Sequence, residues 1–385
     1  MKIAIEAQRI FRKKKHGMDI AVLELIRALQ RIDIYNEYFI IAKAGEDNKV
    51  LSETPNFHII ETRFASYPVW EQKILPAKLK EIDPDVLHCT SDTAPLQVNC
   101  PLVLTLHDIL FMNKVDLRRG TLYQRAGNVY RRWVVPKVVK KCCRIITVSN
   151  FEQKEIIKCF PNIRDKVVTI YNAQSEYFKV VADINELKKY KEDHDLPDNF
   201  ILYLGNTHPN KNLVNVLRLL KILNQYEQTR IPLVIPDVNQ QFLNAMLGEA
   251  GAGAEDIRDY IHLTGYVPNK DLVYLYNLAT LFIYPSFYES FGIPILESMA
   301  CGTPVITSNR AAMPETAGGA ANLADPFNPQ NMSVAVLELI CNEEVYNRCV
   351  VEGLKRAGEF SWKSAAEAVL ETYKEIYNEV QLVGH

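Results

Sequence analysis

The chain has 385 residues, 48% of them hydrophobic and 23% charged, with a formal net charge of −2. This length and composition suit two α/β domains with hydrophobic cores better than one domain. No run of about 18 apolar residues occurs, so no transmembrane helix is predicted. Glu6 interrupts the first apolar stretch, which is therefore expected to be a strand and not a signal peptide.

Six apolar stretches in the first half of the chain predict strands. Amphipathic stretches separate several of them, for example residues 20–32. Continuous apolar strands that alternate with helices are typical of a parallel, doubly wound sheet. The expected strands are Ile3 to Ala7, Tyr38 to Ala42, Phe57 to Glu61, Val86 to Cys89, Leu102 to Leu106 and Arg144 to Val148.

The same pattern restarts after the polar stretch 188–199, which predicts a second sheet. We place the boundary near residues 178–198, with domains over 1–180 and 195–361 and a last helix from about residue 363 to 377. The expected strands of the second sheet are Phe200 to Leu204, Pro232 to Ile235, Ile261 to Leu263, Leu281 to Tyr284 and Val305 to Thr307.

Two glutamates separated by seven residues are the most informative feature of the second half. Glu289 follows the expected strand 281–284, and Glu297 lies about one turn inside the next expected helix. The unpaired N–H groups of Gly292 and Ile293 at the helix start form an anion site. A phosphate there, flanked by carboxylates that accept from hydroxyls, fits a nucleotide-sugar. The plainer alternative is a surface carboxylate followed by a solvated helix glutamate.

This segment resembles that of the retaining family 4 glycosyltransferases. The resemblance rests on Tyr284 to Glu289, Ala300 to Val305 and Pro314-Glu315, and it covers nearly the whole chain. It implies the GT-B fold, in which two Rossmann-like domains face a cleft and a C-terminal helix, here 362–385, crosses back onto the first domain. Further matches in the family's order are His107-Asp108, Thr147 to Ser149, Leu202 to Gly205, Lys211-Asn212, Gly265 to Val267, Asp325-Pro326 and Phe360 to Trp362.

The resemblance also implies roles for individual residues. Glu289 corresponds to the glutamate that contacts the donor sugar, and Glu297 to the one that holds the ribose hydroxyls. Lys211, expected beside a helix start, corresponds to a lysine that touches the donor phosphates. His107, Lys211 and Glu289 are the candidate catalytic residues. The candidate donor-binding residues are Gly17, Gly205, Asn206, Lys211, Tyr266, Val267, Glu289, Ser290, Phe291, Gly292, Ile293 and Glu297.

Two of these positions, both in the first domain, have open alternatives. Gly17 resembles a glycine loop that closes over the diphosphate, but a plain turn would also place a glycine there. His107 ends an expected strand, where ligands of open α/β sheets bind, and would steady the sugar without acting as a nucleophile. A structural pair with Asp108 is the alternative.

The chain departs from the family at one point. The arginine usually found after the glycine, or before the lysine, is replaced by Asn206 and Asn210. One expected positive charge is therefore missing. This substitution is the only support for a catalytically weak scaffold.

Three other patterns imitate functional motifs. Asp83-Pro-Asp85 matches the DxD of metal-dependent glycosyltransferases, but it precedes an expected strand, where Asp-Pro favours a turn. Gly251-Ala-Gly253 lacks the third glycine of a dinucleotide fingerprint and is expected to be a loop. His88 is expected to be a core histidine. The eight cysteines form no Cys-x-x-Cys pair, so reduced, mostly buried thiols in a cytosolic protein are expected.

Positive charge is concentrated in the first half. Residues 117–144 hold nine Lys or Arg and no acid, interleaved with Tyr123, Tyr130 and Trp133. Such a stretch either lies on an anionic membrane surface or is a solvated helix face. No nucleic-acid-binding module is found and the pI is near neutral, so a nucleic-acid partner is not expected.

These observations predict a cytoplasmic, metal-independent, retaining glycosyltransferase without a cofactor. It would move a hexose, with mannose as the leading choice, from a nucleotide-sugar to a glycan or lipid-linked acceptor. We expect the protein to contact the inner face of the membrane through residues 117–144. The alternatives are a sugar-nucleotide epimerase or hydrolase on the same fold, or a non-catalytic nucleotide-sugar-binding scaffold.

Overall fold

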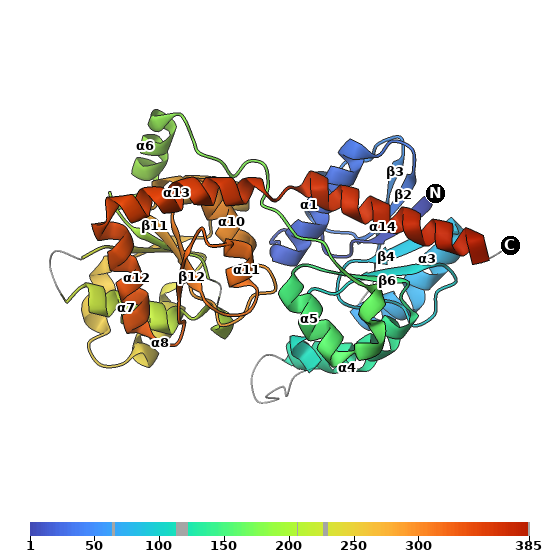
Figure 1. The fold of residues 1–385 in the computed structure, drawn as a ribbon, viewed down its shortest axis with the longest axis horizontal. Coiled ribbons are helices and arrows are strands. Elements are labelled where there is room, and N and C mark those ends of the chain that lie inside the picture. The colour runs from blue at the N-terminus through green and yellow to red at the C-terminus, as the bar shows by residue number, and fades with distance from the viewer. Residues whose placement is uncertain (64–65, 113–121, 206, 226–229, 384–385) are drawn as a thin grey trace. The chain divides into compact units, whose positions relative to one another are not determined.

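The computed structural model describes residues 1–63, 66–112, 122–205, 207–225 and 230–383. The chain divides into two compact units. Unit 1 contains Met1–Asn172 and Ser361–His385, and unit 2 contains Ala173–Phe360. Each unit is a parallel sheet with helices on both faces, so the predicted fold class is confirmed (Figure 1).

Unit 1 has a sheet with the strand order β3-β2-β1-β4-β5-β6-β7, in which all pairs are parallel. The strands are β1 (Lys2–Glu6), β2 (Glu37–Lys43), β3 (Phe57–Thr62), β4 (Val86–Cys89), β5 (Leu102–Thr105), β6 (Arg144–Thr147) and β7 (Val167–Thr169). The helices are α1 (Gly17–Ile32), α2 (Tyr67–Val69), α3 (Leu75–Ile82), α4 (Leu122–Lys141), α5 (Asn150–Cys159) and α14 (Trp362–Val383).

Unit 2 has a sheet with the order β10-β9-β8-β11-β12-β13, again parallel throughout. Its strands are β8 (Ile201–Tyr203), β9 (Leu233–Pro236), β10 (Ile261–Gly265), β11 (Leu281–Tyr284), β12 (Val305–Ser308) and β13 (Asn322–Ala324). Its helices are α6 (Ile184–Asp193), α7 (Leu213–Leu223), α8 (Gln240–Ala250), α9 (Leu272–Leu278), α10 (Ile293–Ala300), α11 (Met313–Ala317), α12 (Pro329–Cys341) and α13 (Glu343–Gly358).

The sequence located β4 and β11 at their observed bounds but missed β7 and β13. Both missed strands have three residues and lie at a sheet edge, where a run is too short to show a period. The predicted boundary was also displaced. Residues 173–180 belong to unit 2, and helix α6 forms within the stretch that was expected to link the domains.

Contacts with helix α9 explain the earlier boundary. The backbone N–H of Val181 donates to Asn277 Oδ1 at 2.8 Å, and Asn277 Nδ2 donates to the carbonyl of Lys179 at 3.0 Å. The ring of Phe178 packs edge-on against Tyr276. These side chains hold residues 178–181 on unit 2 although their own sequence carries no strand or helix signal.

Helix α14 packs along α1 and completes the core of unit 1 (Figure 1). Tyr373 is fully buried, and its hydroxyl lies 2.6 Å from Nδ1 of His88. Nε2 of His88 lies 2.7 Å from the Thr105 hydroxyl. Burial, with a smaller effect of His107, lowers the pKa of His88 to about 3, so the ring is neutral. His88 is therefore the core histidine that the sequence predicted.

The other sequence patterns that resemble functional motifs also have structural roles. Asp83 ends α3 in a left-handed conformation, with a φ of 51°. Oδ2 of Asp85 accepts from the backbone N–H of Lys2 at 2.7 Å, which ties it to the start of β1. Gly251 and Gly253 lie in the loop after α8. All eight cysteines are free thiols, four of them buried, three half-buried and Cys341 exposed.

Candidate functional site

The carboxyl ends of parallel strands meet at one edge of a sheet, and in unit 2 this edge collects most of the predicted donor-binding residues. Lys211 follows β8, and Glu289 follows the neighbouring strand β11. Nζ of Lys211 donates to Oε1 of Glu289 at 2.7 Å and to the hydroxyl of Tyr284 at 2.7 Å. The structure therefore joins two residues that are 78 positions apart in the sequence.

The Lys211–Glu289 pair is largely withdrawn from solvent, with 21% and 17% of the side chains exposed. Burial by itself would lower the pKa of Lys211, but Tyr284 and Glu289 reverse this effect and raise it above its usual value. The ammonium group is charged at every physiological pH. It has three donors, and the two described bonds leave one that can reach a ligand.

A glycine makes this arrangement possible. The hydroxyl of Tyr203 donates to the carbonyl of Lys211 at 2.9 Å and so fixes the turn that carries the lysine. A Cβ at Gly205 would lie 2.2 Å from that hydroxyl, which no side chain can tolerate. Gly205 is therefore required for the shape of the turn. Its neighbour Asn206 lies outside the described residues.

Helix α10 starts beside Glu289, as the sequence predicted. Gly292 caps it with a φ of 97°, a left-handed conformation that suits glycine. Ile293 is the first helical residue and Ser290 is half-buried, while Phe291 is buried against the ring of Phe360. The helix therefore begins four residues after Glu289, the acidic member of the ion pair.

Glu297 lies one turn further along α10 and is 6% exposed. Its Oε2 accepts from the hydroxyl of Tyr276 at 2.9 Å. Burial raises its pKa to about 7, because this single hydrogen bond only partly offsets the loss of water. A group with hydroxyls to donate would complete the solvation of this carboxylate.

The residues predicted to contact the nucleotide base follow β10, the outermost strand on one side of the unit 2 sheet. Strand β10 ends at Gly265, whose φ is 72°. The next side chain, Tyr266, is 53% exposed, whereas Val267 is buried. The carbonyl of Gly265 accepts from the backbone N–H of Asp237 at 2.7 Å, which holds the two strand ends together. An exposed ring on a fixed loop is suited to stacking on a flat ligand.

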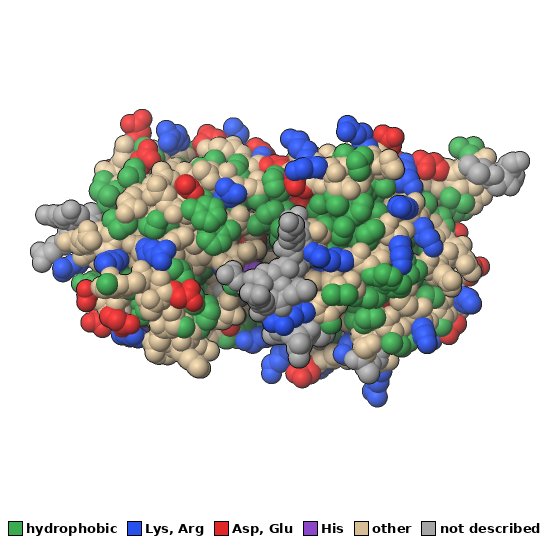
Figure 2. Space-filling view, turned by 90° about the horizontal axis from the view of Figure 1, so that it is seen from below, with side chains coloured by type: hydrophobic (Ala, Val, Ile, Leu, Met, Phe, Trp, Pro, Cys, Tyr) green, Lys and Arg blue, Asp and Glu red, His purple; other side chains and the backbone are tan. Residues whose placement is uncertain are grey.

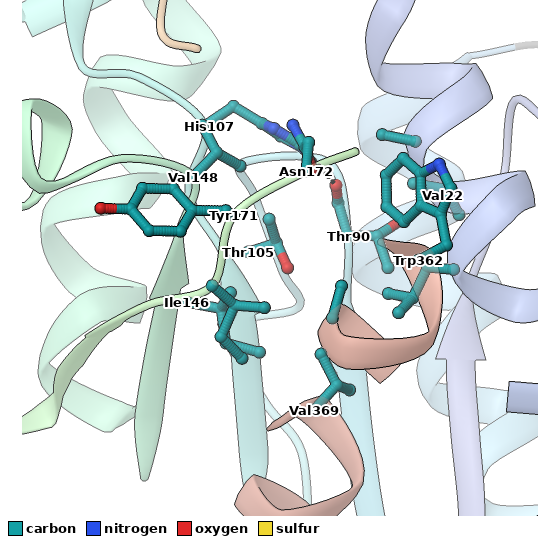
Figure 3. A pocket seen from close by; sticks show the side chains of 14 residues that line it. Val22, Thr90, Thr105, His107, Ile146, Val148, Tyr171, Asn172, Trp362 and Val369 are labelled. Carbon is teal, nitrogen blue, oxygen red and sulfur yellow. Dashed lines mark hydrogen bonds between the residues drawn. The ribbon is translucent and has the colours of Figure 1, made fainter. Parts of the chain in front are cut away.

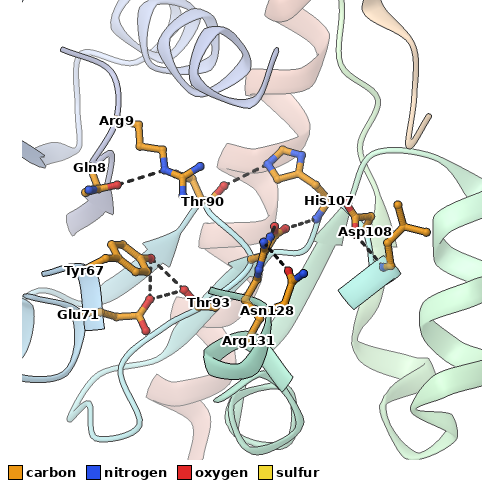
Figure 4. Close-up of polar contacts among 12 residues, drawn as sticks. Gln8, Arg9, Tyr67, Glu71, Thr90, Thr93, His107, Asp108, Asn128 and Arg131 are labelled. Atoms are coloured by element: carbon orange, nitrogen blue, oxygen red, sulfur yellow. Dashed lines mark hydrogen bonds and ion pairs between the residues drawn. The ribbon is translucent and has the colours of Figure 1, made fainter. Parts of the chain in front are cut away.

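The remaining predicted residues, His107 and Gly17, belong to unit 1. Nε2 of His107 lies 3.1 Å from the carbonyl oxygen of Thr90, and because a carbonyl only accepts, Nε2 is the donor of this bond. The backbone N–H of His107 donates to Asp92 at 2.8 Å (Figure 4). Asp108 accepts instead from the backbone of Leu110, so the alternative of a His107–Asp108 pair is not observed.

A buried carboxylate that the sequence did not single out lies at the same edge of the unit 1 sheet. Glu71 accepts from the Tyr67 hydroxyl at 2.7 Å and from the Thr93 hydroxyl (Figure 4). It also accepts from Gln72 Nε2 at 3.0 Å and from the Tyr130 hydroxyl. Burial raises its pKa although all four bonds oppose that effect. The carboxylate's acceptor capacity is fully used, which assigns Glu71 to holding these loops together.

A small pocket in unit 1 adjoins His107 (Figure 3). Figure 3 shows His107, Asn172 and Thr90 toward one end and Ile146 and Val369 toward the other. Its volume of about 30 Å³ holds one or two water molecules and is far below that of a sugar site. This pocket is a gap between the sheet, α1 and α14.

Gly17 is the first residue of α1, and a Cβ added there would meet no atom within 4 Å. The fold of unit 1 therefore does not require glycine at this position. The expected role in closing over a diphosphate is untested.

Sequence reasoning missed Tyr284, Tyr276 and Tyr203, which hold Lys211 and Glu297 through their hydroxyls. Each lies in a strand or helix whose apolar sequence predicts a buried element of the core. A tyrosine at the last residue of a strand, as at 203 and 284, was the available signal.

Two family models match the chain. Residues 16–173 match "Glycosyltransferase Family 4", and residues 184–356 match "Glycosyl transferases group 1". O-antigen chain mannosyltransferase B of Escherichia coli is 33% identical over 230 residues, which are 60% of this chain and 60% of that protein. The alignment thus spans less than two thirds of this relative. The MMP α-(1→4)-mannosyltransferase of Mycolicibacterium hassiacum is 24% identical over 76% of this chain and 71% of its own.

Solved structures share the fold over almost the full length. Sucrose-phosphate synthase of Thermosynechococcus elongatus has a TM-score of 0.75 at 16% identity, covering 98% of this chain and 99% of its own. HepE of Anabaena, solved with UDP and glucose, has a TM-score of 0.74 at 18% identity, covering 97% and 100%. Within the described residues, no helix is long and apolar enough to cross a membrane.

The raised pKa of Glu297 makes stability depend on pH. Its pKa is about 7 in the folded protein against an ordinary 4.5, so the folded state binds the proton more tightly and loses stability as pH rises from 4.5 to 7. The loss is on the order of 3 kcal/mol. Glu297→Gln cannot ionise, so it should not undergo this loss. Its stability relative to that of the wild type should therefore be greater at pH 8 than at pH 5.

Denaturant unfolding at both pH values would measure this gain. Glu371→Gln, at an exposed position on α14, is the matched control and should show no such difference. An equal offset between wild type and Glu297→Gln at pH 5 and pH 8 would contradict the assignment.

Proposed function

We propose a reaction for this chain from the premise that it belongs to the GT-B glycosyltransferases. It transfers a hexose, with mannose as the leading choice, from a nucleotide-sugar to a hydroxyl of a glycan or glycolipid, with retention of configuration. The observation that carries the proposal is the Lys211–Glu289 pair beside the start of α10, with Glu297 one turn away.

The chemistry follows from the charges at this edge. The bond between the anomeric carbon and the diphosphate oxygen breaks, and the acceptor oxygen bonds to the same carbon from the same face. The leaving oxygen gains negative charge, which Lys211 and the N–H groups of Gly292 and Ile293 stabilise. The acceptor's proton passes to the leaving phosphate. These groups supply the positive charge that a metal would otherwise provide.

The choice of mannose is supported by the mannosyltransferase relatives. A guanosine diphosphate donor is the corresponding choice of nucleotide. A thermal-shift panel of nucleotide-sugars tests it, because a ligand that binds only the folded state raises the melting temperature. A larger shift with another nucleotide-sugar than with GDP-mannose would overturn the choice.

Donor turnover distinguishes the alternatives. Transfer that requires an acceptor supports the glycosyltransferase. Rapid donor hydrolysis without an acceptor, or interconversion of donor epimers, supports the hydrolase or epimerase on the same fold. Tight nucleotide binding without any turnover supports the scaffold, for which the missing charge at Asn206 and Asn210 is the motivation.

The two glutamates should affect different steps. Glu297→Ala should weaken binding of the free nucleoside diphosphate by roughly 1.5–3 kcal/mol, because a charged hydrogen bond to ribose is lost. Glu289→Gln retains an acceptor for Lys211 and should leave that binding nearly unchanged while lowering turnover. Calorimetry and initial rates measure both effects, with exposed Glu352→Ala as the control. Equal losses of nucleotide affinity at both glutamates would contradict these roles.

Activity should survive an excess of chelator, because Lys211 and the start of α10 face the diphosphate. Lys211→Ala should lower turnover far more than Asp83→Asn, since Asn also tolerates the left-handed conformation at residue 83. Rates with EDTA, and with added Mg²⁺ or Mn²⁺, measure this. Loss of turnover in chelator that Mn²⁺ restores would assign a metal to the reaction.

We further propose that unit 1 contacts an anionic membrane through helix α4. Its buried face carries Val134, Val135, Val138 and Val139, and its outer face exposes Val129 and Trp133. Nζ of Lys137 lies 3.8 Å from the centre of the Trp133 ring. Figure 2 views the side on which Figure 1 draws α4 and α5, where hydrophobic side chains are bordered by Lys and Arg.

Some of the basic residues expected to face the membrane have other partners. Nε of Arg132 bonds the carbonyl of Phe111, and Arg131 lies 3.7 Å from Asp92. Arg118, Arg119 and the side chain of Tyr123 lie outside the described part of the chain. Lys137, Lys140 and Lys141 are exposed at the other end of the helix and carry the proposal.

Trp133→Ser combined with Lys137→Ser and Lys140→Ser should therefore abolish salt-sensitive binding to vesicles that contain anionic lipid. Each basic residue contributes on the order of 1 kcal/mol, falling steeply with salt. Co-sedimentation measures the binding, and Lys188→Ser with Lys189→Ser on α6 is the control of similar charge. Absence of wild-type binding at low salt would make a soluble acceptor the better explanation.

A further inference from the structure

Arg310 occupies a defined position at the ligand-binding edge of unit 2. It follows β12, which pairs with β11, the strand that leads to Glu289. The backbone N–H of Ala312 donates to the carbonyl of Glu289 at 3.3 Å, so the two loops are joined. In the order of the strands across the sheet, the residues predicted to contact the base follow β10, Lys211 follows β8, Glu289 follows β11 and Arg310 follows β12.

An aromatic stack supports the Arg310 guanidinium. Its central carbon lies 5.3 Å from the ring centre of Phe327. The Phe327 ring stacks on the Phe287 ring with centres 4.6 Å apart and an angle of 20° between the ring planes. The N–H of Phe287 donates to the carbonyl of Asn210 at 2.8 Å, which connects the stack to the turn that carries Lys211.

Buried hydrogen bonds hold the backbone beside both rings of this stack. Nδ2 of Asn212 donates to the carbonyls of Pro285 and Pro326 at 2.9 and 2.7 Å, and Nδ2 of Asn215 donates to Pro326 at 3.0 Å. Both asparagines are buried. The backbone next to Phe287 and the backbone next to Phe327 are therefore held by buried hydrogen bonds, although Phe327 itself is 58% exposed.

Arg310 has no acidic partner among the described residues, in contrast to Lys211. A guanidinium on an aromatic ring loses little conformational freedom when it binds, and it offers paired N–H groups that match a phosphate or carboxylate. A fixed cation with free donors beside a substrate site is suited to recognise an anion.

We propose that Arg310 binds an oxyanion, a phosphate or carboxylate group, of a ligand held at this edge, and that Phe327 positions the guanidinium. The inference rests on the proposed function in so far as the ligand is the donor or the acceptor. The oxyanion belongs either to the donor diphosphate or to an acid group of the acceptor. The strand order favours the acceptor, because Arg310 lies beyond Glu289 from the base contact.

Two titrations by calorimetry distinguish these sources, one with guanosine diphosphate and one with inorganic phosphate added to protein saturated with guanosine diphosphate. Arg310→Ala should weaken one of them roughly tenfold or more, as loss of a charged hydrogen bond requires. Arg310→Lys should recover only part of the affinity, because a lysine cannot bind in a bidentate manner. Arg348→Ala, an exposed arginine on α13, is the control.

Each result has one meaning. Weaker binding of guanosine diphosphate assigns Arg310 to the donor diphosphate. Unchanged nucleotide binding with loss of phosphate binding assigns it to a separate acid group. If neither titration responds to Arg310→Ala, the inference is overturned. Failure of the wild type to bind any nucleotide overturns the proposed function instead, and phosphate titration of the nucleotide-free protein then tests Arg310 alone.

Discussion

The ion pair between Lys211 and Glu289 is the interaction on which the rest of the candidate site depends. A lysine that is largely withdrawn from water needs a partner, and here Glu289 and Tyr284 provide it. The pair forms only because β8 and β11 are neighbours, and because Gly205 leaves room for the hydroxyl of Tyr203. The pair fixes the position of the Lys211 ammonium group before any ligand binds, so that little rearrangement is needed.

The two units use buried polar groups in different ways. In unit 2 the groups at the sheet edge have spare hydrogen-bonding capacity within the described part of the chain: Lys211 keeps a donor, Glu297 has one side-chain partner, and Arg310 has no acidic partner. In unit 1 Glu71 and His88 have every bond they can make. A fully bonded buried group stabilises its surroundings, whereas a group with spare capacity can bind a ligand. The contrast separates the scaffold of this protein from its candidate site.

Much of the site was accessible to sequence reasoning because its parts lie at predictable places. Strand β11, Glu289, the cap at Gly292 and helix α10 follow one another within a short segment, so a local pattern reveals them. The roles of Tyr203, Tyr276 and Tyr284 could not be found in this way, since each lies in an apolar strand or helix and its hydroxyl bonds to a residue of a different element. The same reason explains why residues 173–180 were expected in the first domain, because contacts with the distant helix α9 hold residues 178–181 on unit 2.

Local sequence patterns predicted the fold class, most of the strands and the segments that form the candidate site, because hydrophobic period and helix-start signals are properties of single segments. Which polar groups meet depends instead on how distant segments pack. Strand order brings residue 211 to residue 289 and residue 310 to residue 327, and a pattern within one segment carries no record of that order. The pKa of Glu297 likewise arises from burial among distant side chains, which is a property of the packed protein and not of its own segment.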